Sequence, residues 1–166
     1  MATIYLYYVP SEKISCEEMI MDAEFSGIER RLDELSERLA RLKALSAKSR
    51  NDFDEDSFLR DIVERNLEVA VQCCIDISHR IIALEKARKP TDYYEAISLM
   101  GELGVIPVDL ARRLAPIAGF RNILAHEYLS VDWDRVYDHL QNLDDLTRFG
   151  GLAREWLVKR IEGDQR

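Results

Sequence analysis

Residues 121–128 combine the side-chain types that bind a phosphodiester and move its protons. The segment reads Arg-Asn-Ile-Leu-Ala-His-Glu-Tyr. Arg121 is a permanent cation with a planar fork of N–H donors, so it can hold a phosphate and stabilise charge on a pentacoordinate transition state. His126 titrates near neutral pH and can serve as a general base or a general acid. Asn122 can hydrogen-bond a phosphate or orient the imidazole, which makes Arg121, Asn122 and His126 the candidate catalytic residues.

These groups suffice to cleave RNA without a metal ion. The 2′-hydroxyl attacks its own phosphate and the products are a 2′,3′-cyclic phosphate and a 5′-hydroxyl, so one base and one acid are enough. The three cysteines, Cys16, Cys73 and Cys74, form no metal-ligand pattern, and no ligands cluster near residues 121–128. We therefore expect neither a metal nor another cofactor.

Each of these residues also has a purely structural interpretation. Arg121 could form an interhelical salt bridge with one of the many carboxylates, and Asn122 could cap neighbouring backbone groups. A single histidine without context more often has a structural role, and Tyr128 alone would be a half-buried aromatic residue at a helix end. The combination of all four within one short segment favours chemistry.

The other two histidines are expected to be ordinary. His79 is three positions after Asp76 on the same predicted helix, which favours a local hydrogen bond between them. His139 follows Asp138 and is expected to lie on the surface. Cys73 and Cys74 are expected to pack inside the same helix as His79.

Helical geometry limits how the candidate residues can cooperate. At about 100° per residue, Asn122 and His126 lie on one face of a helix, whereas Arg121 and His126 are about 140° apart. The arginine and the imidazole converge only if the long Arg side chain sweeps round, if the helix ends near His126, or if a second subunit completes the site. The spacing therefore favours a pocket at a helix end or at a dimer seam.

Apolar residues at alternating steps of four and three predict two long helices that form an antiparallel hairpin. The first seam is Met21, Phe25, Ile28, Leu32, Leu35, Leu39 and Leu42. The second is Val63, Leu67, Ala70, Cys74, Ile77, Ile81 and Leu84, widened by Ile62, Val69 and Cys73. The wider stripe of the second helix indicates that it is the central helix of the bundle, and Asp54 or Asp56 can cap its start. The polar residues 46–54 connect the two helices.

Shorter helices are predicted to follow the hairpin. One runs from Thr91 or Asp92 to Leu103 and ends at Gly104. The next begins at Pro107 and carries the candidate residues, with a kink or break expected at Pro116.

The last main helix is expected to be capped by Asp132 and to end at Gly150-Gly151, before an amphipathic tail. The predicted fold is an all-α antiparallel bundle of about five main helices. Its predicted organisation is an N-terminal extension at residues 1–20, a helical domain at 21–150 and a helical tail at 151–166.

The net charge of −8 argues against a sequence-independent nucleic-acid coat, because phosphate contacts need clustered Lys and Arg. RNA binding would then depend on a local basic patch. The candidates are Arg80, Lys86, Arg88 and Lys89 at one helix end, and Arg112, Arg113 and Arg121 around residues 121–128. No apolar run approaches the roughly 20 residues of a membrane span, and the cysteine usage favours a reducing cytoplasm.

The pattern Arg, four residues, His, one residue, Tyr, with Asn directly after the Arg, resembles the catalytic motif of HEPN-superfamily ribonucleases. More closely, it resembles the HepT toxins of toxin–antitoxin pairs. The likeness includes Cys-Ile-Asp-Ile-Ser-His at 74–79, Pro-Thr-Asp-Tyr-Tyr-Glu at 90–95 and Ala-Gly-Phe at 118–120, and it covers about residues 21–150. We call residues 121–128 the RNase motif below.

The resemblance implies a metal-independent endoribonuclease toxin with an RNA substrate. It also implies a homodimer in which the motif helices of two subunits face each other across a cleft. Its partner would be a cognate MntA-type nucleotidyltransferase antitoxin, which attaches AMP to Tyr128. Anionic phosphates placed next to Arg121 would occupy the anion site and block the substrate.

Two other functions are compatible with the same residues. One is a catalytically inert helical subunit that binds nucleotides or RNA and assists the nucleotidyltransferase; Arg121 would then only bind phosphate, and His126→Ala would leave the biological effect intact. The other is a plain structural bundle, favoured by the heptad seam and the negative charge. In that case Arg121→Ala and His126→Ala would be silent apart from stability.

Overall fold

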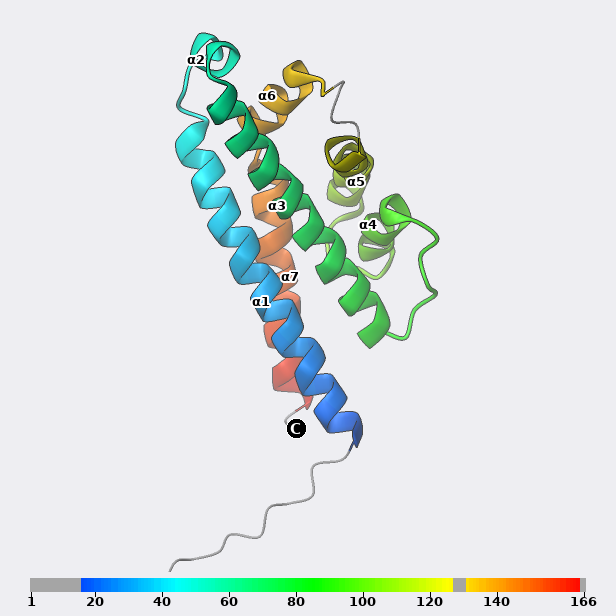
Figure 1. The fold of residues 1–166 in the computed structure, drawn as a ribbon. Coiled ribbons are helices and arrows are strands. Elements are labelled where there is room, and N and C mark those ends of the chain that lie inside the picture. The colour runs from blue at the N-terminus through cyan, green and yellow to red at the C-terminus, as the bar shows by residue number, and fades with distance from the viewer. Residues whose placement is uncertain (1–15, 127–130, 165–166) are drawn as a thin grey trace, which may run out of the picture.

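The computed structural model describes residues 16–126 and 131–164, with side chains described at 19–119 and 131–163. Within these residues the chain forms seven helices and no strand (Figure 1). The helices are α1 (Cys16–Leu45), α2 (Arg50–Glu55), α3 (Ser57–Leu84), α4 (Tyr93–Glu102), α5 (Val108–His126), α6 (Trp133–Gln141) and α7 (Asp144–Asp164). The predicted all-α bundle is confirmed, with seven helices rather than about five.

The predicted helical hairpin is formed by α1 and α3, which lie side by side along the molecule (Figure 1). The seam positions between Phe25 and Leu42 in α1, and between Val63 and Ile81 in α3, are buried as predicted. Met21 and Leu84, at the ends of the two seams, are partly buried against the same core. Ile62 is an exception, because half of its side chain is exposed (50%).

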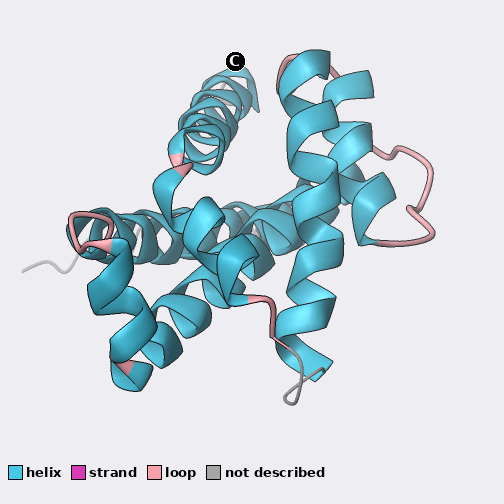
Figure 2. Ribbon diagram, turned by 90° about the horizontal axis from the view of Figure 1, so that it is seen from above, coloured by secondary structure: helices cyan, strands magenta, loops and turns pink. Residues whose placement is uncertain are grey.

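The central position of α3 follows from its wide apolar stripe. Of the described helices, α3 packs against all six others. The helix α5 runs across the direction of α1 and α3 (Figures 1 and 2). A helix surrounded in this way must be apolar over most of its circumference, and the sequence of α3 meets this condition.

Aspartate side chains cap three helices at the predicted positions. The Asp56 carboxylate accepts a hydrogen bond of 3.1 Å from the Leu59 amide at the start of α3. Asp92 and Asp132 do the same for α4 and α6, at 2.7 and 3.1 Å. Each cap satisfies an amide that has no partner within its own helix.

The short helix α2 was not predicted, although its start carries a local signal. Ser49 and Asp52 form a capping box, in which each side chain accepts a hydrogen bond from the other's backbone amide. Phe53 of α2 is fully buried and packs against the rings of Trp133 and Tyr137, at centroid distances of 6.2 and 5.2 Å. The helix α2 therefore joins α6 to the α1–α3 hairpin.

The end of the chain differs from the prediction. The helix predicted between Asp132 and Gly150 divides at Asn142, and α7 continues through Gly150 and Gly151 to Asp164. A Cβ built on Gly150 would lie 3.2 Å from Leu35 Cδ2, so the missing side chain lets α7 approach α1. Glycine weakens a helix by only about 1 kcal/mol relative to alanine, and packing against α1 offsets this loss.

Both predicted domain boundaries fall inside helices, at residue 20 in α1 and at residue 150 in α7. The assignment of the catalytic unit to residues 21–150 stays a prediction. Over the described ranges, the chain contains no helix of the length and apolar character needed to cross a membrane.

Candidate active site

The RNase motif begins in the last two turns of α5. Arg121, Asn122 and His126 belong to this helix, and Tyr128 lies outside the described residues. Because the backbone from 121 to 126 is helical, Asn122 and His126 share one face, while Arg121 and His126 are about 140° apart. One straight helix therefore does not align the arginine with the imidazole, and the site needs a further element or a second subunit.

The first half of α5 is anchored in the core. The Ala111 amide donates a hydrogen bond of 3.0 Å to the Pro107 carbonyl, which starts the helix where the sequence predicts. Leu110, Leu114, Ala115 and Ala118 are buried, so a continuous stripe holds this half of the helix. The RNase motif is thus carried by a helix that is held in the core between Leu110 and Ala118.

The sequence predicts that Pro116 kinks or breaks α5. The prediction of a break is wrong. The helix continues through Pro116 as far as His126. Proline removes one amide donor and leaves the carbonyl four residues earlier, on Arg112, without its helical partner. Pro116 and Arg112 are both exposed, so water can hydrogen-bond this carbonyl and the helix can tolerate the proline.

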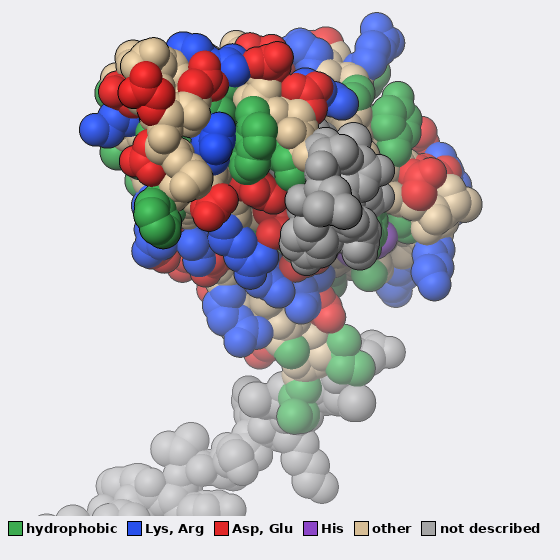
Figure 3. Space-filling view, turned by 45° about the horizontal axis from the view of Figure 1, so that its top comes forward, with side chains coloured by type: hydrophobic (Ala, Val, Ile, Leu, Met, Phe, Trp, Pro, Cys, Tyr) green, Lys and Arg blue, Asp and Glu red, His purple; other side chains and the backbone are tan. Residues whose placement is uncertain are grey.

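The predicted basic patch is only partly available to bind phosphate. Arg80 pairs with Glu24 at 2.6 Å, Arg88 pairs with Glu95, and Arg113 pairs with Asp109 and Asp145. By contrast, Lys86, Lys89 and Arg112 are exposed, and among the described residues none of them has an ion-pair partner. Lys and Arg side chains gather in the lower half of the face drawn in Figure 3, so the surface is locally basic despite the net charge of −8.

The predictions for the other histidines are corrected. His79 does not bind Asp76; its ring lies edge-on to Tyr93 at 6.2 Å, and Asp76 pairs with Arg31 at 3.0 Å. His139 is half-buried rather than on the surface, and burial lowers the pKa of its imidazole, with a smaller effect of Arg135. Both histidines belong to helices other than α5, as predicted.

The thiols of Cys73 and Cys74 pack in the core, as predicted. Burial raises the pKa of Cys73 to about 11 and also raises the pKa of Cys74. A thiol with a raised pKa is a poor nucleophile and a poor metal ligand at neutral pH. In the part of the chain that the structure describes, no group of three His, Cys, Asp or Glu side chains is placed to hold a metal ion.

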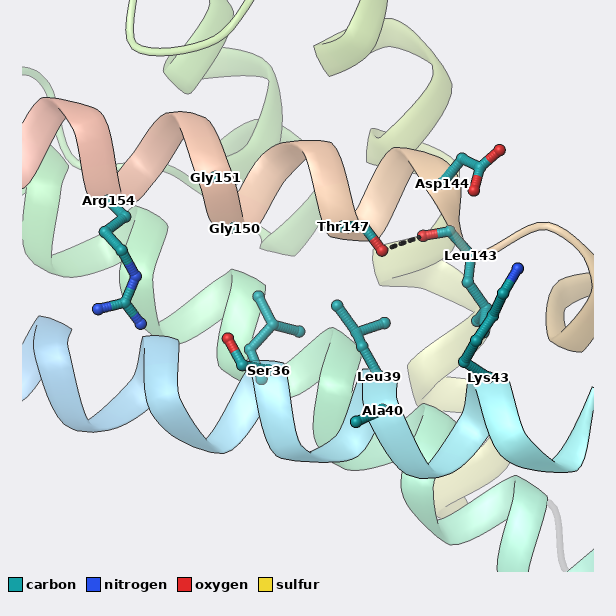
Figure 4. A pocket seen from close by; sticks show the side chains of 11 residues that line it. Ser36, Leu39, Ala40, Lys43, Leu143, Asp144, Thr147, Gly150, Gly151 and Arg154 are labelled. Atoms are coloured by element: carbon teal, nitrogen blue, oxygen red, sulfur yellow. Dashed lines mark hydrogen bonds between the residues drawn. The ribbon is translucent and has the colours of Figure 1, made fainter.

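Several cavities lie apart from the described residues of α5. A groove of about 460 Å³ separates α1 from α7, where Leu39 and Ala40 face Thr147, Gly150 and Gly151 (Figure 4). The Thr147 hydroxyl donates a hydrogen bond of 3.0 Å to the Leu143 carbonyl. The groove is lined by no residue of α5, so it is not part of the candidate site at the RNase motif. A second cavity lies where α1, α3 and α4 meet.

Comparison with protein families decides which class of helical bundle this is. The model of a family described as "Ribonuclease HepT-like" matches residues 35–150. The match spans α2 to α6 together with the last part of α1, from residue 35, and the first two turns of α7. The chain belongs to the HepT-like ribonuclease family.

Two curated members of the HepT-like family are similar in sequence. The tRNA nuclease HepT of Aphanizomenon flos-aquae is 33% identical over 110 residues, which are 66% of this chain and 75% of the relative. The mRNA nuclease HepT of Shewanella oneidensis is 30% identical over 98 residues, which are 58% of this chain and 74% of the relative.

Solved structures share the HepT-like fold. The tri-AMPylated HEPN toxin of Shewanella oneidensis, in complex with its MNT antitoxin, aligns with a TM-score of 0.70 and 24% identity, covering 77% of this chain and 96% of that one. The cytosolic protein YutE of Bacillus subtilis, of unknown function, aligns with a TM-score of 0.71 and 20% identity, covering 81% and 91%. At these identities the alignments show the fold alone.

The expected HepT-like membership and the all-α bundle are therefore confirmed. The roles of Arg121, Asn122, His126 and Tyr128 stay predictions. The sequence pattern itself located the candidate residues, and α5 shows that three of them occupy consecutive turns of one helix.

Proposed function

We propose that this protein is the endoribonuclease toxin of a toxin–antitoxin pair, acting without a metal ion and neutralised by AMP transfer to Tyr128. The observation that carries the proposal is the position of Arg121, Asn122 and His126 at the described end of α5, in a chain of the HepT-like ribonuclease family. The nuclease names of the two curated relatives support it.

The proposed reaction needs one cation and two proton transfers. Arg121 holds the scissile phosphate, and Asn122 hydrogen-bonds the phosphate or the imidazole. His126 removes the proton from the 2′-hydroxyl or returns one to the leaving 5′-oxygen. The 2′-oxygen–phosphorus bond forms as the phosphorus–5′-oxygen bond breaks, so the fragments end in a 2′,3′-cyclic phosphate and a 5′-hydroxyl.

The proposed working unit is a homodimer. Arg121 and His126 are about 140° apart on one helix, and a second copy of α5 can pair Arg121 of one protomer with His126 of the partner subunit. The site is then assembled across the subunit interface. Free thiols at Cys73 and Cys74 favour a reducing compartment, so we place the protein in the cytoplasm.

Expression in bacteria tests the catalytic proposal. We expect the wild type to arrest growth and to produce RNA fragments that end in a cyclic phosphate, and we expect Arg121→Ala and His126→Ala to abolish both. Arg148→Ala is the control, because Arg148 is an exposed arginine of α7 that does not belong to the predicted basic patch. Arrest that survives both substitutions would move the function away from the RNase motif.

The regulation of Tyr128 has a separate test. The crystallised Shewanella oneidensis toxin is tri-AMPylated and bound to its antitoxin, which supports a nucleotidyltransferase as the partner here. We expect intact-mass measurement after co-expression with that enzyme to show one or more added AMP groups. Tyr128→Phe should remain unmodified and toxic; a modified Tyr128→Phe protein would place the acceptor elsewhere.

A further inference from the structure

An open hollow with an aromatic wall lies where α1, α3 and α4 meet. Its volume is about 620 Å³, within the range of pockets that hold small organic molecules. His79 of α3 and Tyr93 of α4 line it, with ring centroids 6.2 Å apart and ring planes at 82°. Tyr93 remains 36% exposed, so its ring can be contacted by a further planar group.

The charged residues that line the hollow are already paired with one another. Arg31 binds Asp76 at 3.0 Å, and Arg80 binds Glu24 at 2.6 Å, each pair linking α1 to α3. The walls therefore offer hydrogen-bond donors and acceptors without an excess of either charge. Such a lining suits a neutral, planar, polar group such as a nucleobase better than it suits a free phosphate.

Two lysines without ion-pair partners lie beyond the hollow along the chain. Lys86 and Lys89 belong to the segment that connects Ala83 of α3 to Tyr93 of α4, and Ala83 and Tyr93 both line the hollow. Lys86 and Lys89 are both exposed, and no ion pair in the described residues involves either of them. In a chain with a net charge of −8, two exposed cations in the segment that connects two walls of the hollow are available for contacts with phosphate.

The packing of α4 on α5 relates the position of Tyr93 along the helix axis to that of the RNase motif. The two helices are joined by residues 103–107 and pack along the length of α4, so they run in opposite directions. Gly101 of α4 lies against Val108 and Ala111 of α5. Tyr93 precedes Gly101 by two turns of α4, so in this antiparallel pair it lies level with residues 117–118 of α5. Along the helix axis, these residues are about 5 Å from Arg121.

We infer that this hollow binds one base of the single-stranded RNA substrate, stacked on Tyr93, while Lys86 and Lys89 contact the adjacent phosphates. The inference rests on the proposed ribonuclease function and adds a substrate-binding surface to the RNase motif. Stacking on an aromatic ring together with cationic contacts to the backbone is the general mode by which proteins hold single-stranded RNA. A protein partner would favour an apolar surface, whereas this hollow is lined mainly by charged and polar side chains.

Binding measurements in a His126→Ala background test the inference without cleavage. The probe is a 5′-fluorescein-labelled, single-stranded oligoribonucleotide of mixed sequence, followed by fluorescence anisotropy. We expect Tyr93→Ala to raise the Kd about ten-fold and Tyr93→Phe to leave it nearly unchanged, because stacking uses the ring and not the hydroxyl. Tyr94→Ala is the matched control, since Tyr94 is the adjacent tyrosine, is 52% exposed and does not line the hollow.

The lysines and the kinetics give two further measurements. Replacing Lys86 or Lys89 by alanine should reduce the slope of log K against log salt concentration by about 0.7 each. In the cleaving protein, with total tRNA as substrate, Tyr93→Ala should raise KM and leave kcat within about two-fold of the wild type. A merely structural role for Tyr93 would instead lower kcat and the melting temperature.

The outcomes separate this inference from the proposed function. A wild-type protein that cuts RNA, with a Tyr93→Ala variant that binds the oligoribonucleotide equally well, would overturn the inference and leave the ribonuclease intact. A wild-type protein that neither binds nor cuts any RNA would overturn both. If Tyr93→Ala changes self-association but not RNA binding, the hollow is a protein interface and the inference fails.

Discussion

The guanidinium of Arg113 in α5 donates two hydrogen bonds to the carboxylate of Asp145 in α7, with N···O distances of 2.7 and 2.9 Å. A third donor of Arg113 binds Asp109, one turn earlier on α5, at 3.0 Å. The pair fixes the helix that carries the RNase motif to the first turn of α7. It also neutralises an arginine that the sequence alone assigned to the RNA-binding patch.

Breaking this pair should produce a pH-dependent loss of stability. The hydrogen bond from Arg113 lowers the pKa of Asp145 below its ordinary value of 3.8. Its contribution to stability is therefore present above that value and is lost as the pH falls through the lower pKa of the folded state. We expect Asp145→Asn to reduce the free energy of unfolding by about 0.5–1 kcal/mol at pH 7 and by much less near pH 2. Urea denaturation at the two pH values measures this, and an equal loss at both would contradict it.

Gly101 should be the glycine least tolerant of substitution. A Cβ at this position would lie 2.8 Å from Ala111 Cβ and 3.3 Å from Val108 Cα, so Gly101→Ala must push α5 away from α4. We expect a loss of about 1–3 kcal/mol in thermal or urea denaturation, together with slower RNA cleavage, because the displaced helix carries the candidate catalytic residues.

Gly151→Ala provides the matched control for Gly101→Ala. It also lies inside a helix, but no other atom lies within 4 Å of the position where its Cβ would stand. The gain in helix propensity should stabilise the protein by about 0.5–1 kcal/mol. Equal effects of the two substitutions would show that the contact between α4 and α5 does not limit side-chain size.

Replacing Lys86 by glycine should make the protein more stable. Lys86 follows the C-cap Glu85 of α3 with a φ of 52°, in the left-handed region, and the next amide, on Ala87, donates to the Ile82 carbonyl at 3.1 Å. At the equivalent position after α4 the chain has Gly104, with a φ of 71°. We expect Lys86→Gly to raise the free energy of unfolding by about 1 kcal/mol. Lys86→Ala keeps a Cβ atom at this left-handed position and should change the free energy of unfolding little. If Lys86→Ala stabilised the protein as much as Lys86→Gly, the cause would be the lost charge and not the backbone conformation.

Cys73 and Cys74 should resist alkylation in the folded protein. Burial raises the pKa of both thiols, that of Cys73 to about 11, so few thiolates exist at pH 8. We expect iodoacetamide followed by peptide mapping to leave both unlabelled until denaturant is added, and RNA cleavage to survive the treatment. Labelling of either residue in the native protein at the rate of a free thiol would show that this part of α3 opens.

Local patterns in the sequence were sufficient to predict most of the helices. The alternating steps from Phe25 to Leu42 and from Val63 to Ile81 predicted the buried seams of α1 and α3, and Asp92 and Asp132 predicted two helix starts. Each signal acts within one or two turns, so it does not depend on the rest of the fold. The capping box at Ser49 would have predicted α2 by the same reasoning.

Where helices end was less predictable, because distant contacts decide it. Gly150 and Gly151 looked like a helix end, yet α7 continues because Gly150 packs against Leu35 of α1. Pro116 looked like a break, yet α5 continues because this position faces solvent and the unpaired carbonyl can bind water. In both cases the local propensity is about 1–3 kcal/mol, which the packing of a whole helix exceeds.

The sequence by itself determined which residues are the candidates for the chemistry, since the order Arg121, Asn122, His126 and Tyr128 is a property of one short segment. Only the tertiary structure decided which cations remain to bind RNA. Arg80 is neutralised by Glu24 and Arg113 by Asp145, residues 56 and 32 positions away, whereas Lys86 and Lys89 have no such partner among the described residues. A charge is cancelled by whatever the fold brings within a few ångströms of it, and that distance cannot be read from the spacing along the chain.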